Sequence, residues 1–296
     1  MEYQAKTDKL VNGIKKYSDQ IGGFAAVYGD MVASCDGVGT KILLAKQAYK
    51  KFQRPLNSIG IDCVAMVVND LICKGANPQF FLDYFAADYI REWEFEQVLA
   101  GIHEGCSQAG MELIGGETAE LDKVIAYDAF DVCGFGVGRI NYPLPRNIQK
   151  GDCIIGLYST GFHSNGYTLI RKHVDKWTVD EELLNKLLEP TKIYVDDIDK
   201  IKRLGITVNA LAHITGGGWD NIYRVLPEGI SIDWAHNDYP YHTSLFKWIE
   251  EEAGLTTEQM YSTFNCGIGM MVVMPNDHLK RMTGNNWIFL GNISSL

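Results

Sequence analysis

The feature that most constrains this chain is the junction in residues 31–52, MVASCDGVGTKILLAKQAYKKF. A short apolar segment runs into Asp36-Gly37-Val38-Gly39-Thr40-Lys41, and apolar residues at helical spacing follow. A plain turn needs one glycine or Asx residue, whereas this turn combines an acid, two glycines, a hydroxyl and a lysine. A glycine-rich turn that opens a helix presents unpaired N–H groups and the positive end of the helix dipole. The junction therefore predicts a strand, a turn that can seat phosphate, and a helix.

Two more turns of this kind occur, in residues 159–166 (STGFHSNG) and 215–218 (TGGG). One such turn is weak support for a ligand, because glycines close turns for structural reasons in most proteins, but three in one chain favour a phosphate-rich ligand. None is a Walker A loop, since GxxxxGK[ST] is absent. The segment GFGVGR at 134–139 has the spacing GxGxG and no helix after it. We therefore interpret its glycines as part of a strand and not as a dinucleotide-binding motif.

Strand-like and helix-like segments alternate along the chain, which predicts an α/β (α+β) fold. The apolar spacing in residues 61–75 predicts a helix with one buried face, capped by Asp62. Helices are also predicted at 94–110 and 219–226. Residues 111–120 predict a short strand that opens into a glycine turn.

The segment NYPLPRNIQKGD, residues 141–152, differs from its surroundings. It is polar, lacks periodicity and holds two of the eight prolines. These properties are typical of a connection between domains. We therefore divide the chain into domains at 1–140 and 141–296.

The composition argues against several classes of protein. The chain has 27 basic and 37 acidic residues, a net charge of −10, whereas general nucleic-acid binding needs a basic surface. No apolar run reaches the roughly 18 residues of a membrane span, and the opening MEYQAKTDKL does not resemble a signal peptide. The seven cysteines are odd in number, scattered and without a CxxC pair. We expect a cytoplasmic protein with no nucleic-acid or membrane partner.

Three acids lie at the ends of predicted elements: Asp36, Asp70 and Glu117. Mg²⁺ takes oxygen ligands, usually a few carboxylates together with phosphate oxygens and water. Each acid also has an ordinary structural explanation. Asp36 suits a helix cap, Asp70 a solvated helix face, and Glu117 a partner for a helix dipole. Periodicity alone leaves both interpretations open.

Two of the seven histidines stand at the mouths of the glycine turns, His163 in STGFHSNGY and His213 in LAHITGGGW. A single histidine is more often structural than catalytic, but polar neighbours such as Ser164 and Thr215 favour ligand contacts here. Among the lysines near the predicted site, only Lys41, inside the turn motif, differs from an ordinary surface lysine.

These motifs occur together in one enzyme family. The segments DGVGTK, GIDCVAMVVNDLICKGANPQFFLDYFA, GGETAEL, GFHSNGYTLIRK, LLEPTKIYV, AHITGGGWDNIYRVLP and TFNCGIGM follow one another in a characteristic order and spacing. In this respect the chain, from about residue 10 to residue 293, resembles the phosphoribosylformylglycinamidine cyclo-ligases, also called aminoimidazole ribonucleotide synthetases.

The resemblance implies a homodimer of two-domain subunits whose N-terminal sheets form a barrel across the dimer. Residues 1–140 would bind ATP and magnesium and dimerise, and residues 141–296 would complete the substrate cleft. The implied reaction is the closure of formylglycinamidine ribonucleotide to aminoimidazole ribonucleotide in purine synthesis, with ATP converted to ADP and phosphate. ATP would first phosphorylate the formyl amide oxygen, and the amidine nitrogen would then displace phosphate. The implied cofactors are ATP and Mg²⁺, with K⁺ as a further candidate cation.

The resemblance also assigns residues. The implied metal ligands are Asp36, Asp70 and Glu117. The implied ATP contacts are Lys15, Gly37, Gly39, Thr40 and Lys41. The implied substrate contacts are Thr160, Gly161, His163, Ser164, Asn165, His213, Thr215, Gly216, Gly217 and Gly218. The implied catalytic residues are His163 and Asn165, which would orient or polarise the formyl amide, and Lys41.

The chain departs from the family pattern at its N-terminus, where the usual YKxAGVDI stretch is reduced to YQAKTDK and the segment from Lys15 to Gly22 is short. The chain also ends soon after WIFLGNI, so we expect a compact protein with both ends trimmed. Thiamine-monophosphate kinases would show DDAA near the start and ISDG in place of ITGGGW. Selenophosphate synthetases would carry a reactive cysteine near the N-terminus, whereas the first cysteine is Cys35. A non-catalytic nucleotide-binding scaffold remains a second alternative.

Overall fold

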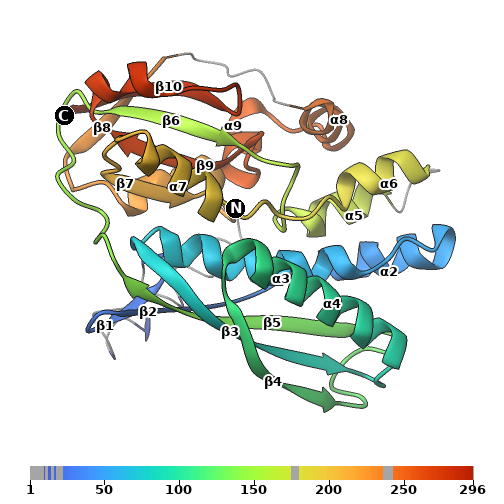
Figure 1. The fold of residues 1–296 in the computed structure, drawn as a ribbon. Helices are drawn as coiled ribbons and strands as arrows, with labels where there is room; N and C mark the ends of the chain where they lie inside the picture. The colour runs from blue at the N-terminus through green and yellow to red at the C-terminus, as the bar shows by residue number, and fades with distance from the viewer. Residues whose placement is uncertain are drawn as a thin grey trace.

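A computed structural model describes residues 10, 13–14, 17, 23–174, 180–235 and 243–295. Two five-stranded sheets organise these residues, with strand orders β1-β2-β5-β3-β4 and β7-β9-β6-β10-β8 (Figure 1). The predicted ATP contact Lys15 lies outside the described residues. The mixture of helices and sheets confirms the predicted α/β (α+β) class.

The first sheet belongs to the first half of the chain. Its strands are β1 (Ala26–Tyr28), β2 (Met31–Gly37), β3 (Ala76–Ala87), β4 (Glu112–Glu120) and β5 (Phe130–Ile140). Neighbours are antiparallel except β3 and β4, which are parallel and joined by the helix α4 (Glu92–Ala109). A parallel pair needs such a crossover, whereas antiparallel strands can be joined by a short turn.

Two further helices, α2 (Lys41–Phe52) and α3 (Asn57–Ile72), lie between this sheet and the second half of the chain (Figure 1). The glycines of β5 allow α3 to pack closely on the sheet. A Cβ at Gly134 would come within 3.1 Å of Cys63 Sγ, and one at Gly136 within 2.6 Å of Val67 Cγ1, and both residues belong to α3. These close approaches explain why GFGVGR is part of a strand, as predicted.

The second sheet and its helices form the other half. Its strands are β6 (Cys153–Tyr158), β7 (Ala210–His213), β8 (Ile230–Trp234), β9 (Ile268–Met274) and β10 (Trp287–Ser295). Its helices are α5 (Tyr167–Val174), α6 (Glu181–Leu187), α7 (Val195–Arg203), α8 (Ser244–Ala253) and α9 (Thr257–Thr263), with 3₁₀ helices η1 (Gly218–Arg224) and η2 (Asn276–Arg281). All strand pairs in this sheet are antiparallel.

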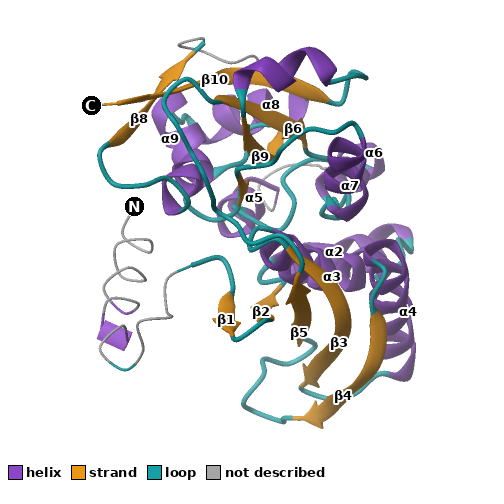
Figure 2. Cartoon of the chain, turned by 60° about the vertical axis from the view of Figure 1, so that its left-hand side comes forward, coloured by secondary structure: helices purple, strands orange, loops and turns teal. Residues whose placement is uncertain are grey.

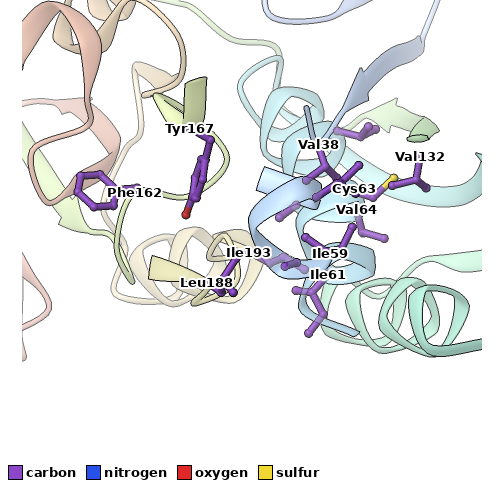
Figure 3. Packing of buried hydrophobic residues seen from close by; sticks show 14 of the residues in the cluster. Val38, Ile59, Ile61, Cys63, Val64, Val132, Phe162, Tyr167, Leu188 and Ile193 are labelled. Atoms are coloured by element: carbon purple, nitrogen blue, oxygen red, sulfur yellow. The ribbon is translucent and has the colours of Figure 1, made fainter. Parts of the chain in front are cut away.

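One apolar cluster runs across the junction of the two halves. It includes Val38 and Ile59 from the first half and Phe162, Tyr167 and Leu188 from the second, all nearly fully buried (Figure 3). Figure 1 shows α5 and α6 beside α2 at this junction, and contacts join α2 to both. Figure 2 shows from another side that α2 and α3 separate the first sheet from the second half. Burial of apolar surface therefore fixes how the halves meet.

Three local predictions are corrected by the structure. The helix predicted at 61–75 begins four residues earlier, at Asn57, so Asp62 lies inside it and does not cap it. The glycines at 115–116 continue β4 without a turn, because the parallel ladder to β3 runs through them. Residues 218–224 form a 3₁₀ helix where an α-helix was predicted.

Of the helices in the described ranges, none has both the length and the apolar character that crossing a bilayer requires. All seven cysteines are free thiols, and Cys35 is exposed.

Candidate active site

The turn between β2 and α2 has the geometry of an anion seat. Gly39 lies in the left-handed region with φ 71°, which favours glycine. The Gly37 N–H donates to Asp36 Oδ1 at 2.8 Å. Thr40 precedes α2 without a side-chain cap, and the first turn of α2 contains no acidic residue. The positive end of the α2 dipole is therefore not neutralised by an acid of its own first turn.

Asp36 and Asp70 lie close enough to interact, although they come from β2 and α3. Burial raises the pKa of Asp36, the Gly37 N–H lowers it, and the charge of Asp70 raises it further. Asp70 is partly buried, and its Oδ1 lies 2.9 Å from His213 Nδ1 at the end of β7. The structure thus brings three predicted site residues from both halves into one corner.

The hydrogen bonds around His213 indicate which ring nitrogen donates. Asn69 Oδ1 accepts from the Tyr194 N–H at 3.0 Å, which leaves the Asn69 amide nitrogen as a donor. That nitrogen donates to the Lys192 carbonyl and lies 3.4 Å from His213 Nε2. His213 Nε2 is then the acceptor and Nδ1 the donor to Asp70. The imidazole is thereby oriented.

The two glycine turns of the second half also meet. Asn165 Oδ1 lies 3.6 Å from the position of a Cβ on Gly216. The Asn221 amide donates to the carbonyls of Gly216 and Gly218, at 3.1 and 2.7 Å. The Asn165 amide nitrogen is buried and has no hydrogen-bond partner among the described residues. An unmet buried donor at the meeting point of two glycine turns is suited to an oxygen of a ligand.

His163 is fully buried, and neither ring nitrogen has a partner in the part of the chain that the structure describes. Its backbone is left-handed, with φ 58°. Burial lowers the pKa of His163 well below its usual value, and the nearby charges of His213, Lys41 and Lys192 act in the same direction. The imidazole is therefore neutral near pH 7 and does not open to solvent in this conformation.

The lowered pKa of His163 predicts a pH-dependent stability. Below about pH 6.5 the unfolded chain binds a proton that the folded chain does not, so the free energy of unfolding should fall as the pH falls. One such group contributes a slope of at most about 1.4 kcal/mol per pH unit. Urea unfolding between pH 5 and pH 7 should show a smaller slope for His163→Gln. The exposed His103→Gln is the control and should keep the parent slope; equal slopes in all three proteins would contradict this prediction.

Lys41 does not occupy the predicted ATP-contact position. Its side chain is completely buried, and its ammonium is 2.8–2.9 Å from Asp62 Oδ1 and the carbonyls of His163 and Glu189. All three donors of a lysine are therefore engaged within the protein. The prediction that Lys41 lines the phosphates, or acts directly on the substrate, is corrected for this conformation.

Glu117 is not brought to Asp36 and Asp70. Across the first sheet Asp36 aligns with Gly134 and Asp83, while Glu117 aligns with Tyr84. Adjacent residues of a strand point to opposite faces, so Asp36 faces α3 and Glu117 faces away. The two strands are also three positions apart, about 14 Å. Among the described residues no three His, Cys, Asp or Glu side chains form a metal-binding group, so the predicted three-acid site is not formed within one chain.

The remaining predicted substrate residues divide into two groups. Thr160 lines a cavity of about 290 Å³ between the α6–α7 connection and the start of α8, and its hydroxyl donates to the Pro190 carbonyl at 2.6 Å. Gly161 accepts from Asn265, and Gly218 packs so closely on Tyr261 that a Cβ would lie 1.9 Å from its carbonyl oxygen. These positions are held by the protein itself. The others stay near the meeting point of the turns, namely Ser164, Thr215, Gly216 and Gly217.

Sequence reasoning missed the residues that hold this site together. Asp62, Asn69, Thr191 and Asn221 are all buried and bond across the site. All four lie within segments that carry the family resemblance, and this was the available signal. Periodicity alone assigns Asp62, Asn69 and Asn221 to packing, because they stand within apolar or glycine-rich patterns.

Comparison with known proteins shows the family of this chain. The family model described as "AIR synthase related protein, N-terminal domain" matches residues 22–140. The companion model for the C-terminal domain matches residues 149–285. The chain belongs to the AIR synthase related family. One relative is the "Phosphoribosylformylglycinamidine cyclo-ligase" of Methylobacillus flagellatus, which is 40% identical to this chain. The alignment covers 90% of this chain and 83% of that enzyme.

Solved structures share the fold of this AIR synthase related protein. The structure described as "AaThiL complexed with AMPPCP and TMP" has a TM-score of 0.71 at 16% identity, covering 97% of this chain and 90% of that one. The hydrogenase maturation protein HypE in complex with ATP has a TM-score of 0.66 at 16% identity, covering 96% and 82%. At these identities the likeness shows the fold alone.

Proposed function

We propose that this protein catalyses the ATP-dependent closure of formylglycinamidine ribonucleotide to aminoimidazole ribonucleotide in purine biosynthesis. The observation that carries the proposal is the 40% identity to a cyclo-ligase over 90% of the chain. The geometry supports the proposal. The first half contributes the carboxylates of Asp36 and Asp70 and the turn at 37–40. The second half contributes the His213 imidazole, the Asn165 amide and two glycine turns.

The chemistry needs an activated oxygen, because an amide oxygen is a poor leaving group. Transfer of the γ-phosphoryl group forms an O–P bond to the formyl oxygen and releases ADP. The amidine nitrogen then attacks the formyl carbon, the C–O bond breaks, phosphate leaves and the nitrogen loses a proton. The protein contributes mainly positioning and charge stabilisation. Gly37, Gly39 and Thr40 would receive the nucleotide phosphates, and the Asn165 amide would donate to a substrate oxygen.

Asp36 and Asp70 are the residues that would hold Mg²⁺. Mg²⁺ commonly binds through one or two protein carboxylates together with substrate phosphates, so two acids suffice. Their mutual repulsion and the burial of Asp36 fit a site that receives a dication. When bound, the ion would neutralise phosphate charge. Glu117 does not share this corner, and no feature of the described residues assigns a K⁺ site.

We infer a homodimer formed through the uncovered face of the first sheet. Tyr28, Met31 and Phe135 share this face and are 82%, 44% and 42% exposed. Such an apolar sheet face is a liability for a monomer and is suited to pairing with a second copy. Glu117 lies on the same face, so in this arrangement it belongs to the dimer interface.

The variant Phe135→Glu should convert the dimer to a monomer, because it places a charge in the centre of the inferred interface. Light scattering after size-exclusion chromatography measures the change directly. Tyr223→Glu is the matched control, since Tyr223 is 47% exposed but lies on η1 of the second half. A monomeric parent, or a dimeric Phe135→Glu, would refute the inferred interface.

The test of the proposed function is incubation with formylglycinamidine ribonucleotide, ATP and Mg²⁺, with aminoimidazole ribonucleotide scored by its diazo colour. Product that depends on both ATP and Mg²⁺ is expected. Nucleotide binding without turnover would instead support a non-catalytic scaffold.

A further inference from the structure

A closed ring of buried polar contacts joins the two halves beside the site. Lys41 Nζ, at the start of α2, lies 2.9 and 2.8 Å from the two oxygens of Asp62 on α3. The same ammonium donates to the carbonyls of His163 and Glu189, both at 2.8 Å. Lys41 and Asp62 are completely buried. One charge pair of the first half therefore binds two backbone segments of the second.

Asp62 completes the ring through Thr191. Its Oδ1 accepts from the Thr191 N–H at 2.7 Å and from the Thr191 hydroxyl at 2.6 Å. The Thr191 hydroxyl lies 3.0 Å from the Ser164 hydroxyl, next to His163. The His163 carbonyl and the Ser164 hydroxyl are thereby connected to the same ion pair, the first through Lys41 and the second through Thr191 and Asp62.

The His163 backbone shows why such a tie matters. Its left-handed conformation is disfavoured for a residue with a side chain and persists only where the surroundings over-determine it. A charge-assisted hydrogen bond from Lys41 to the His163 carbonyl is stronger than a neutral one and fixes the orientation of this peptide. The direction of the imidazole and the placement of Asn165 follow from it.

The position of Lys41 in its helix also needs an explanation. A cation in the first turn of a helix opposes the dipole, and burial lowers the pKa of Lys41. The nearby charge of Asp62 opposes that lowering. Burial and the helix dipole both disfavour a charged lysine at the start of α2. The ring of contacts explains its presence, because it needs a cation with several hydrogen-bond donors.

We propose that Lys41 is a positioning residue, which through its pair with Asp62 sets the 163–165 segment at a fixed place relative to the Gly37–Thr40 turn. The ammonium of Lys41, which directly follows the Gly37–Thr40 turn in sequence, thus holds the 163–165 segment at a fixed position relative to that turn. This inference rests on the proposed function for the identity of the two ligands.

The chain provides a matched control in the same helix. Lys46 is 5% exposed and pairs with Glu94, which is 1% exposed, at 2.5 Å. It also reaches Asp128, so both of its partners belong to the first half of the chain. Removing Lys41 leaves Asp62 without its paired cation, and removing Lys46 leaves Glu94 with Arg91 at 3.8 Å, so both changes are destabilising. Only Lys41→Met also releases the 163–165 segment.

The test compares Lys41→Met with Lys46→Met. We expect both variants to lower the urea midpoint. Only Lys41→Met should lower kcat/KM for formylglycinamidine ribonucleotide, by at least about 10-fold, through a higher KM, a lower kcat or both. The affinity for ATP should stay at the parent value in both. Thr191→Val, which keeps its N–H bond to Asp62, should show a smaller change of the same kind and serves if Lys41→Met does not fold.

A second readout does not depend on activity. In protein labelled with ¹⁵N-histidine, the His163 ring signals, assigned with His163→Gln, should move in Lys41→Met and stay in Lys46→Met. Equal turnover losses in the two lysine variants, or an unmoved His163 signal in Lys41→Met, would overturn the proposal. Weakened ATP binding in Lys41→Met would also overturn it, in favour of a direct phosphate contact. An inactive parent with a moved signal would overturn the proposed function and leave the positioning supported.

Discussion

Asp70→Asn is expected to lower kcat/KM for ring closure by about 100-fold, with a matching loss of Mg²⁺-dependent ATP binding. Two effects combine in this residue. The substitution removes one of two carboxylate charges at the corner where the nucleotide-bound cation would sit. It also replaces the acceptor of the His213 Nδ1–H, 2.9 Å away, by an amide that can present a donor instead. The imidazole would then lose its fixed orientation.

The decisive measurement for Asp70→Asn is ATP affinity titrated against Mg²⁺. Asp152→Asn is the matched control, because Asp152 is a buried carboxylate that accepts from Asn209 at 2.8 Å in the second sheet, away from the corner. That control should lower the unfolding midpoint and leave the Mg²⁺ dependence unchanged. If Asp70→Asn bound Mg²⁺–ATP like the parent, Asp70 would not be part of the metal site.

Asn165→Ala should lower kcat by about 100-fold while leaving ATP affinity unchanged. The variant should not lose stability, since the buried Asn165 amide nitrogen has no partner among the described residues. An unmet buried donor costs about 1–3 kcal/mol, so its removal offsets the packing that is lost. Lower activity at equal or higher stability is the signature of a group kept for a ligand and not for folding.

Asn209→Ala is the contrasting variant. Its amide donates to Asp152 at 2.8 Å, so truncation should lower the unfolding midpoint and leave turnover intact. Paired urea unfolding and steady-state kinetics distinguish the two asparagines. A destabilised Asn165→Ala with parent turnover would show that this side chain is structural.

Much of the fold was predictable because helices and strands bury one face. The spacing of Val64, Val67, Val68 and Leu71 located α3, although the helix begins earlier, at Asn57. The start was misplaced because Asp62, which resembles a cap in sequence, is in fact buried against Lys41. No strand is predicted from the sequence over β3, because Pro78 closely follows the helix predicted at 61–75 and is typical of a helix stop. The proline fits since the ladder to β4 begins only at Phe80.

The candidate site was less predictable, because its contacts join residues far apart in the sequence. Lys41 donates to the carbonyls of His163 and Glu189, which are 122 and 148 positions away. Its motif suggests a phosphate contact, whereas in the fold its ammonium has a structural role. Glu117 was grouped with Asp36 and Asp70 as a metal ligand but points to the other face of the sheet, which depends on strand register. Which of these residues meet is therefore decided by the fold, and their motifs in the sequence do not show it.

Isotope transfer tests the central claim most directly. Formylglycinamidine ribonucleotide carrying ¹⁸O in the formyl group would be converted in the presence of ATP and Mg²⁺, and the released phosphate examined by ³¹P NMR. If the formyl oxygen is phosphorylated before ring closure, the ¹⁸O appears in inorganic phosphate, one atom for each turnover. Product formed with unlabelled phosphate would contradict this account.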